Sequence, residues 1–182
     1  MSSVSTTKKR RWIKPTLIVS GAAIVLTLGF WLWLPSNGLP TARKFIRWKF
    51  DDVSHTTPAE LAARLGNDDH TPALLWDVRR ADEFSVSHLP NAIRVSPETT
   101  DVELKDIIPE NNQPIIVYCS VGYRSAKMAR RLKALGHTNV SNLEGAIFAW
   151  ATEGHPLEGG NTVHPYNTFG RRMLGDELEA EY

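Results

Sequence analysis

The sequence contains one cysteine, Cys119, and an arginine, Arg124, follows it with four residues between them. The apolar run PIIVYC (114–119) predicts a buried strand that ends at this cysteine, and SAKMARRLKAL (125–135) predicts an amphipathic helix directly after it. A loop that curls from a strand into a helix N-terminus turns successive backbone N–H groups towards its own centre, so it can bind an anion. Gly122 permits the backbone angles that such a curl needs.

The helix N-terminus and the charge of Arg124 are expected to favour the thiolate of Cys119, which is the nucleophilic form of a cysteine. The sequence around the cysteine therefore predicts a reactive thiol inside an anion-binding loop. Judged by spacing alone, an inert buried cysteine at the end of a strand is an equally good interpretation.

Alternating strand and helix patterns surround this loop. Short apolar runs predict strands at 73–78, 92–95 and 139–142, and a helix is expected within 145–151. Thr57-Pro58-Ala59-Glu60 is a capping box with proline at the first helical position, and it opens a helix that should stop at Gly66. The expected fold is an α/β domain with a parallel sheet flanked by helices, and Cys119 would lie at the sheet edge where such folds bind ligands.

Composition and charge exclude several classes of function. A single cysteine allows no intramolecular disulfide and no site with several thiolate ligands. The six histidines are scattered without an i, i+4 pair, so neither a metal ion nor a cofactor is expected. Lys and Arg total 21 against 20 Asp and Glu, which argues against a nucleic-acid partner that binds a strongly basic face.

A stretch without charge runs from Thr16 to Leu34 and is about 28 Å long as a helix, close to the ~30 Å core of a bilayer. It predicts an uncleaved transmembrane anchor; a cleaved signal peptide is the weaker alternative, because the stretch is long and ends in FWLWLP. The denser basic cluster precedes it, which favours a cytoplasmic N-terminus and an extracytoplasmic catalytic domain, periplasmic if the source is bacterial. The expected organisation is a basic tail (1–14), an anchor (15–35), a juxtamembrane linker (36–50), the α/β domain (51–160) and a C-terminal tail (161–182).

The chain resembles the rhodanese-like sulfurtransferase family across 51–160. LLWDVRRADEFSVSHLPNAIRV (74–95) is similar to the family's first signature, and the sequence from 114 to 150 is similar to its active-site strand, loop and helix and to its closing Leu-Glu-Gly block. The family's usual glycines are replaced by Asn91, which tolerates a left-handed turn, and by Ala146, where only a mild change in helix packing is expected.

The resemblance implies a single-domain sulfurtransferase without a cofactor, and the expected anchor attaches it to a membrane. In such a protein Cys119 carries a persulfide between a small anionic donor, such as thiosulfate, and a thiophilic acceptor, which can itself be a protein. The backbone amides of the loop would stabilise the persulfide, and Arg124 would also hold the donor. The loop residues meant here are Ser120, Val121, Gly122, Tyr123 and Arg124. Asp77 and Arg79 match the family's Asp-Val-Arg, and we interpret them as a supporting ion pair; His88 is expected to be structural.

Three alternatives follow from the same residues. A cysteine phosphatase or arsenate reductase has five residues between cysteine and arginine, and this chain has four. A tethered rhodanese module could instead act as a sulfur carrier, a binding domain or a sensor without significant thiosulfate turnover. In the tail, His164-Pro165-Tyr166 is interpreted as a packed segment, with partner docking or covering of a pocket as alternatives.

Overall fold

The structure is a computed structural model that describes residues 15–66, 72–109 and 112–180. The chain divides into two compact units, Met1–Trp33 and Leu34–Tyr182. Helix α1 (Pro15–Lys49) belongs to both. The predicted basic tail, 1–14, lies outside the described residues, as do the side chains of 15–20 and 22.

In the first unit, the described apolar side chains of α1 are exposed except for Trp31, which is half-buried. Leu26 is 74% exposed and Leu32 is 82% exposed. Within the described part of the chain, no helix has both the length and the apolar character that crossing a membrane requires.

The segment 36–50, which we expected to be a linker, is helical up to Lys49 even though Pro35 and Pro40 lie inside the helix. The reason is burial, because Leu34, Leu39 and Ile46 all pack into the second unit. The apolar contacts of these side chains offset the backbone hydrogen bonds that the prolines remove.

The second unit is built on a five-stranded parallel sheet with the order β1-β5-β4-β2-β3, which confirms the predicted fold class. Its strands are β1 (Ser54–Thr56), β2 (Leu74–Asp77), β3 (Ile93–Arg94), β4 (Ile115–Tyr118) and β5 (Val140–Leu143). Strand β1 was not predicted, because SHT carries no apolar pattern. The three strands β5, β4 and β2 are central, so their carboxyl ends meet at the edge that carries Cys119.

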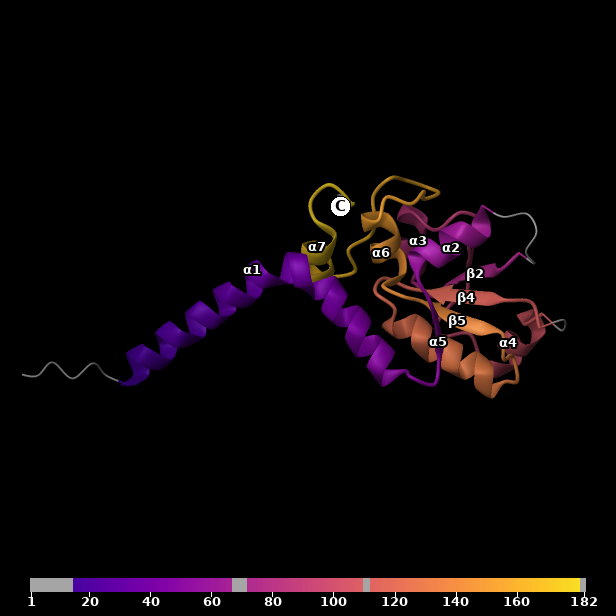
Figure 1. Cartoon of the computed structure of the whole chain (residues 1–182), viewed down its shortest axis with the longest axis horizontal. Helices are drawn as coiled ribbons and strands as arrows, with labels where there is room; N and C mark the ends of the chain where they lie inside the picture. The colour runs from indigo at the N-terminus through magenta and orange to yellow at the C-terminus, as the bar shows by residue number, and fades with distance from the viewer. Residues whose placement is uncertain (1–14, 67–71, 110–111, 181–182) are drawn as a thin grey trace, which may run out of the picture. The chain divides into compact units, whose positions relative to one another are not determined.

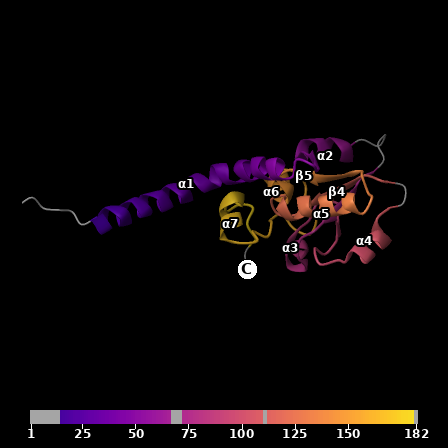
Figure 2. The same cartoon turned by 90° about the horizontal axis from the view of Figure 1, so that it is seen from below.

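Helices cover both faces of this sheet, with α5 and α4 on one side and α6 and α2 on the other (Figures 1 and 2). Side chains alternate between the faces along β4: Ile116 and Tyr118 pack towards α6, whereas Ile115, Val117 and the following Cys119 pack towards α5. The helices of this unit after α1 are α2 (Pro58–Leu65), α3 (Ala81–Val86), α4 (Asp101–Ile107), α5 (Tyr123–Ala134), α6 (Ala146–Thr152) and α7 (Thr168–Leu174).

Local backbone signals are confirmed at several positions. Thr57 and Glu60 form both hydrogen bonds of the predicted capping box, and Gly66 caps the end of α2. Asn91 has a φ of 59°, the left-handed turn that we expected asparagine to tolerate. The expectation for Ala146 was incomplete: its φ is 51°, so replacing the usual glycine strains the backbone and does not only alter packing.

Candidate active site

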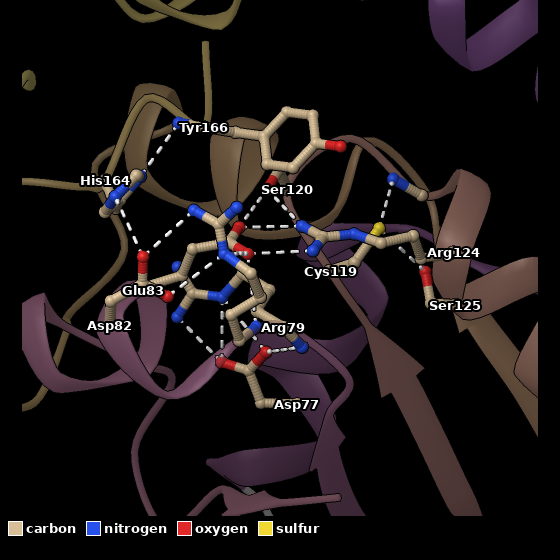
Figure 3. A network of polar contacts seen from close by, with 12 residues as sticks. Asp77, Arg79, Asp82, Glu83, Cys119, Ser120, Arg124, Ser125, His164 and Tyr166 are labelled. Atoms are coloured by element: carbon tan, nitrogen blue, oxygen red, sulfur yellow. Dashed lines mark hydrogen bonds and ion pairs between the residues drawn. The ribbon is translucent and has the colours of Figure 1, made fainter. Parts of the chain in front are cut away.

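Cys119 lies between β4 and α5, as predicted, and it is 1% exposed. The backbone N–H of Gly122 donates a hydrogen bond to its Sγ at 3.2 Å, and the hydroxyl of Ser125 donates to it at 3.5 Å (Figure 3). Gly122 is the N-cap of α5 and has a φ of 111°, a conformation that a side chain would strain. The loop therefore directs a backbone donor and the N-terminus of a twelve-residue helix at the sulfur.

Arg124, which we expected to bind a donor, is held by a carboxylate that the sequence analysis did not single out. Its Nη1 and Nη2 donate to the two carboxylate oxygens of Glu83 at 2.8 and 2.7 Å. The Glu83 side chain is fully buried, and that of Arg124 is 24% exposed. This bidentate pair fixes the guanidinium and neutralises much of its charge.

The electrostatics of this pair follow from its burial. Burial raises the pKa of Glu83, but the hydrogen bonds and the charge of Arg124 outweigh it, so the pKa lies below its ordinary value. Burial alone would lower the pKa of Arg124; the bonds to Glu83 and the nearby Cys119 raise it instead. Both groups are therefore charged at neutral pH.

Ser120 connects the pair to the loop that follows Cys119. Its hydroxyl donates to Glu83 at 3.0 Å and accepts from Nη2 of Arg124 at 2.9 Å. Ser120 is also buried, and its backbone carbonyl accepts a bond from Phe148 N–H at the start of α6. The backbone after Cys119 is thus fixed from both sides.

Asp77 and Arg79 form the predicted ion pair at the end of β2, and neither side chain is exposed. Arg79 Nε and Nη2 bind both carboxylate oxygens, and Nη2 also donates to the carbonyl of Ser87 at 2.6 Å. His88 follows Ser87 in the chain, where its ring stacks on Phe84. These contacts tie β2 to the segment after α3, which agrees with the supporting role that the sequence suggested.

Tyr123 and Val121 lie on the outer side of the loop. The ring of Phe50 meets that of Tyr123 edge-on at 5.3 Å, and Lys49 Nζ lies 5.4 Å from the centre of the Tyr123 ring. Ile46 packs beside Gly122, and Val121, which is half-buried, touches the cores on both faces of the sheet. The end of α1 therefore supports the loop between Cys119 and α5, which no pattern in the sequence indicated.

The C-terminal tail also reaches the loop. Val163, His164 and Leu174 are buried, so the segment packs on the domain, and Tyr166 lies with its ring centre 4.7 Å from the Arg124 guanidinium carbon (Figure 3). Burial lowers the pKa of His164, whose Nδ1 accepts the backbone N–H of Tyr166 at 2.9 Å. The expected packing of the tail on the domain is therefore confirmed, and it brings Tyr166 against Arg124.

No trio of histidine, cysteine, aspartate or glutamate side chains that could hold a metal ion occurs within 15–66, 72–109 and 112–180. What the arrangement offers is a buried thiol, a backbone donor, a helix N-terminus and a fixed arginine. These groups can stabilise negative charge that develops on sulfur.

Comparison with known proteins agrees with this geometry. Residues 57–153 match the family model of the Rhodanese-like domain. A protein described as a sulfurtransferase from Allochromatium vinosum is 29% identical over 105 residues, which cover 58% of this chain and 94% of that protein. A tRNA uridine(34) hydroxylase from Escherichia coli is 30% identical over 127 residues, 68% of this chain but only 34% of the relative. The crystal structure of a thiosulfate sulfurtransferase from Pseudomonas aeruginosa shares the fold with a TM-score of 0.56 at 24% identity, covering 65% of this chain and 22% of that one.

Proposed function

We propose, since the chain belongs to the rhodanese-like domain family, that it is a sulfurtransferase that moves a sulfane sulfur through a persulfide on Cys119. The observation that carries the proposal is the buried Sγ at the N-terminus of α5, with the Gly122 N–H donating to it. The relative from Allochromatium vinosum, which is described as a sulfurtransferase, supports the same class of reaction.

The reaction proceeds in two displacements. The Cys119 thiolate attacks the outer sulfur of thiosulfate or of a persulfide donor, the donor's S–S bond breaks, and sulfite or a thiolate leaves with the electron pair. A nucleophilic acceptor then attacks the outer sulfur of the Cys119 persulfide, and the Cys119 thiolate is released. Because each half-reaction is complete before the next begins, ping-pong kinetics are expected.

The residues around Cys119 have separate roles in this proposal. The Gly122 N–H and the helix N-terminus stabilise the charge on sulfur, and Ser125 donates to the same atom. Arg124 supplies a fixed positive charge, while Asp77 and Arg79 keep the end of β2 in place. No step calls for a metal ion or an organic cofactor.

The test is mass spectrometry of the purified chain after incubation with thiosulfate. One additional sulfur atom on Cys119, absent in Cys119→Ser and removed by cyanide, is the expected result. An unmodified Cys119 with both thiosulfate and a persulfide donor would contradict the proposal. The shorter loop also leads us to expect no aryl phosphatase activity, since a phosphoryl group needs a larger ring of amides.

A second candidate is a sulfur carrier that serves a dedicated protein partner without significant thiosulfate turnover. The observation that favours it is the Glu83 carboxylate, which already occupies two donors of Arg124. Loading of Cys119 by a protein persulfide, combined with negligible thiosulfate:cyanide turnover, would select this candidate.

We further propose that residues 15–35 anchor the protein in a membrane, with the N-terminus in the cytoplasm and the catalytic domain outside it. Support comes from the uncharged run from Thr16 to Leu34 and from exposed apolar side chains such as Leu28 and Leu32. If the source is bacterial, protease added to spheroplasts should digest the domain. A domain that survives while an outer-face control is cut would refute the orientation, and a chain recovered without detergent or membranes would refute the anchor.

A further inference from the structure

We propose that Tyr166 determines donor specificity by covering Arg124, so that the site disfavours small dianionic donors such as thiosulfate. It would favour donors whose sulfur is attached to a larger, less charged group. This inference rests on the proposed sulfurtransferase function and names the class of donor.

The Arg124 guanidinium already forms hydrogen bonds inside the protein. Arg124 donates to both oxygens of Glu83 and to Ser120, so its Nη1 and Nη2 atoms are engaged in the interior (Figure 3). The Tyr166 ring lies over it at 4.7 Å. These three bonds use three of the five N–H groups of the guanidinium, so an incoming anion would meet a charge that is already paired and would approach it beside the Tyr166 ring.

The C-terminal tail holds Tyr166 in place. Its φ of 66° is left-handed, a conformation that a non-glycine residue keeps only when its surroundings enforce it. Its N–H donates to His164 Nδ1, and the next N–H, of Asn167, donates to the Pro165 carbonyl at 2.7 Å. A side chain on Gly170 would come within 1.9 Å of that carbonyl oxygen, so α7 packs directly against the turn.

The left-handed backbone of Tyr166 does not serve to bury its side chain in the core. Tyr166 is 47% exposed, and its ring contacts a second guanidinium, that of Arg80, at 5.7 Å. A strained residue with an exposed ring over a charged group of the site is typical of a functional constraint. The ring offers an apolar surface over Arg124, at the side of the loop that follows Cys119.

The chemistry of the donor then decides the preference. When the Cys119 thiolate displaces sulfite from thiosulfate, two negative charges approach a guanidinium that is already paired with Glu83 and lies under the Tyr166 ring. With benzenethiosulfonate, the same S–S bond breaks and benzenesulfinate leaves with the electron pair, but the donor carries one charge and a phenyl ring. The Tyr166 ring can pack against that phenyl group.

The experiment measures access to Cys119 without turnover, using the full chain in a mild detergent. The second-order rate of Cys119 alkylation is compared for anionic iodoacetate and neutral iodoacetamide. Tyr166→Asn removes the ring and keeps a residue that adopts left-handed backbone, and Tyr166→Gly is the second variant should the first not fold. Removing the ring should raise the iodoacetate to iodoacetamide ratio by about threefold, the size of effect expected for uncovering one partly screened charge.

Two controls define the ring's role. Tyr166→Phe keeps the ring and should retain the wild-type alkylation ratio. Phe169→Asn removes a ring of similar exposure from the same tail and should leave the alkylation ratio unchanged. In the donor assay, Tyr166→Asn should lower the KM for thiosulfate and raise the KM for benzenethiosulfonate, with kcat little changed.

An unchanged or lower alkylation ratio in a folded Tyr166→Asn or Tyr166→Gly chain would overturn the inference, as would the same ratio change in Phe169→Asn. Failure of the proposed function looks different. The alkylation ratio would still respond to the ring, but neither donor would add sulfur to Cys119.

Discussion

The Glu83–Arg124 pair provides the sharpest test of how the site is held together, because Glu83→Gln keeps the shape of the side chain and removes its charge. Removing one partner of a buried ion pair costs about 3–5 kcal/mol. Because the Arg124 side chain remains 24% exposed, water can partly solvate the orphaned charge, and we expect the lower end, about 3 kcal/mol. For a chain of this size that corresponds to a Tm lower by roughly 6–12 °C.

The effect should depend on pH in a defined direction. The pKa of Glu83 is below its ordinary value of 4.5 in the folded chain, so the unfolded chain binds the proton more readily. The stability that this carboxylate contributes is therefore complete above the unfolded pKa and is lost as the pH falls through the lower folded pKa. The Tm difference between wild type and Glu83→Gln should be largest near neutral pH and shrink in acid.

The assay is thermal unfolding of the full chain followed by circular dichroism at several pH values. Asp82→Asn is the matched control, because it removes the neighbouring carboxylate, which is exposed and paired with the exposed Arg80. An exposed pair contributes about 0–1 kcal/mol, so this variant should melt close to wild type. If Glu83→Gln melts no lower than Asp82→Asn at pH 7, the pair does not hold the site in the way described.

Three further substitutions test other supports of the site, the first two by thermal unfolding together with sulfur transfer to cyanide and the third by the alkylation ratio of Cys119. Phe50→Ala removes a buried ring from behind the loop and should lower the free energy of unfolding by about 3–5 kcal/mol. Phe45→Ala, on the exposed side of α1, should lower it by less than about 1 kcal/mol. Equal losses of stability in the two variants would contradict the support from α1. Gly122→Ala puts a side chain at a φ of 111° and should cost about 1–3 kcal/mol and reduce transfer; unchanged stability and transfer would show that the loop does not need the glycine conformation at this position. Gly170→Ala forces a methyl group against the Pro165 carbonyl and should displace the tail, giving the same rise in the alkylation ratio as loss of the Tyr166 ring; a wild-type ratio would count against the tail geometry.

The elements that present Cys119 could be predicted because their signals are local. The capping box at Thr57 and Glu60 joins residues three apart, and the apolar run at 114–119 leads directly into the turn at Gly122. Such patterns act over one helical turn or one strand, so they can be recognised without knowing the rest of the fold. The parallel sheet and the position of the thiol at its edge followed from these patterns.

The helical continuation of α1 could not be predicted in the same way. The expected linker from 36 to 50 began where the uncharged run ends, and Pro35 and Pro40 are themselves strong local signals against a helix. Burial of Leu39 and Ile46 against the domain overrides those signals. That burial exists only once the sheet and α5 are assembled.

The partners of the catalytic loop were decided by tertiary structure alone. Glu83 lies 41 residues before Arg124, and its acidic side chain has the same local pattern as any helix N-terminal glutamate. Tyr166 lies in the C-terminal tail, for which the sequence left three interpretations open: packing on the domain, docking of a partner and covering of a pocket. The sequence by itself determined where the sheet places Cys119. Which carboxylate binds Arg124 and which ring covers it depend on contacts between distant segments, and these form only when the whole domain packs.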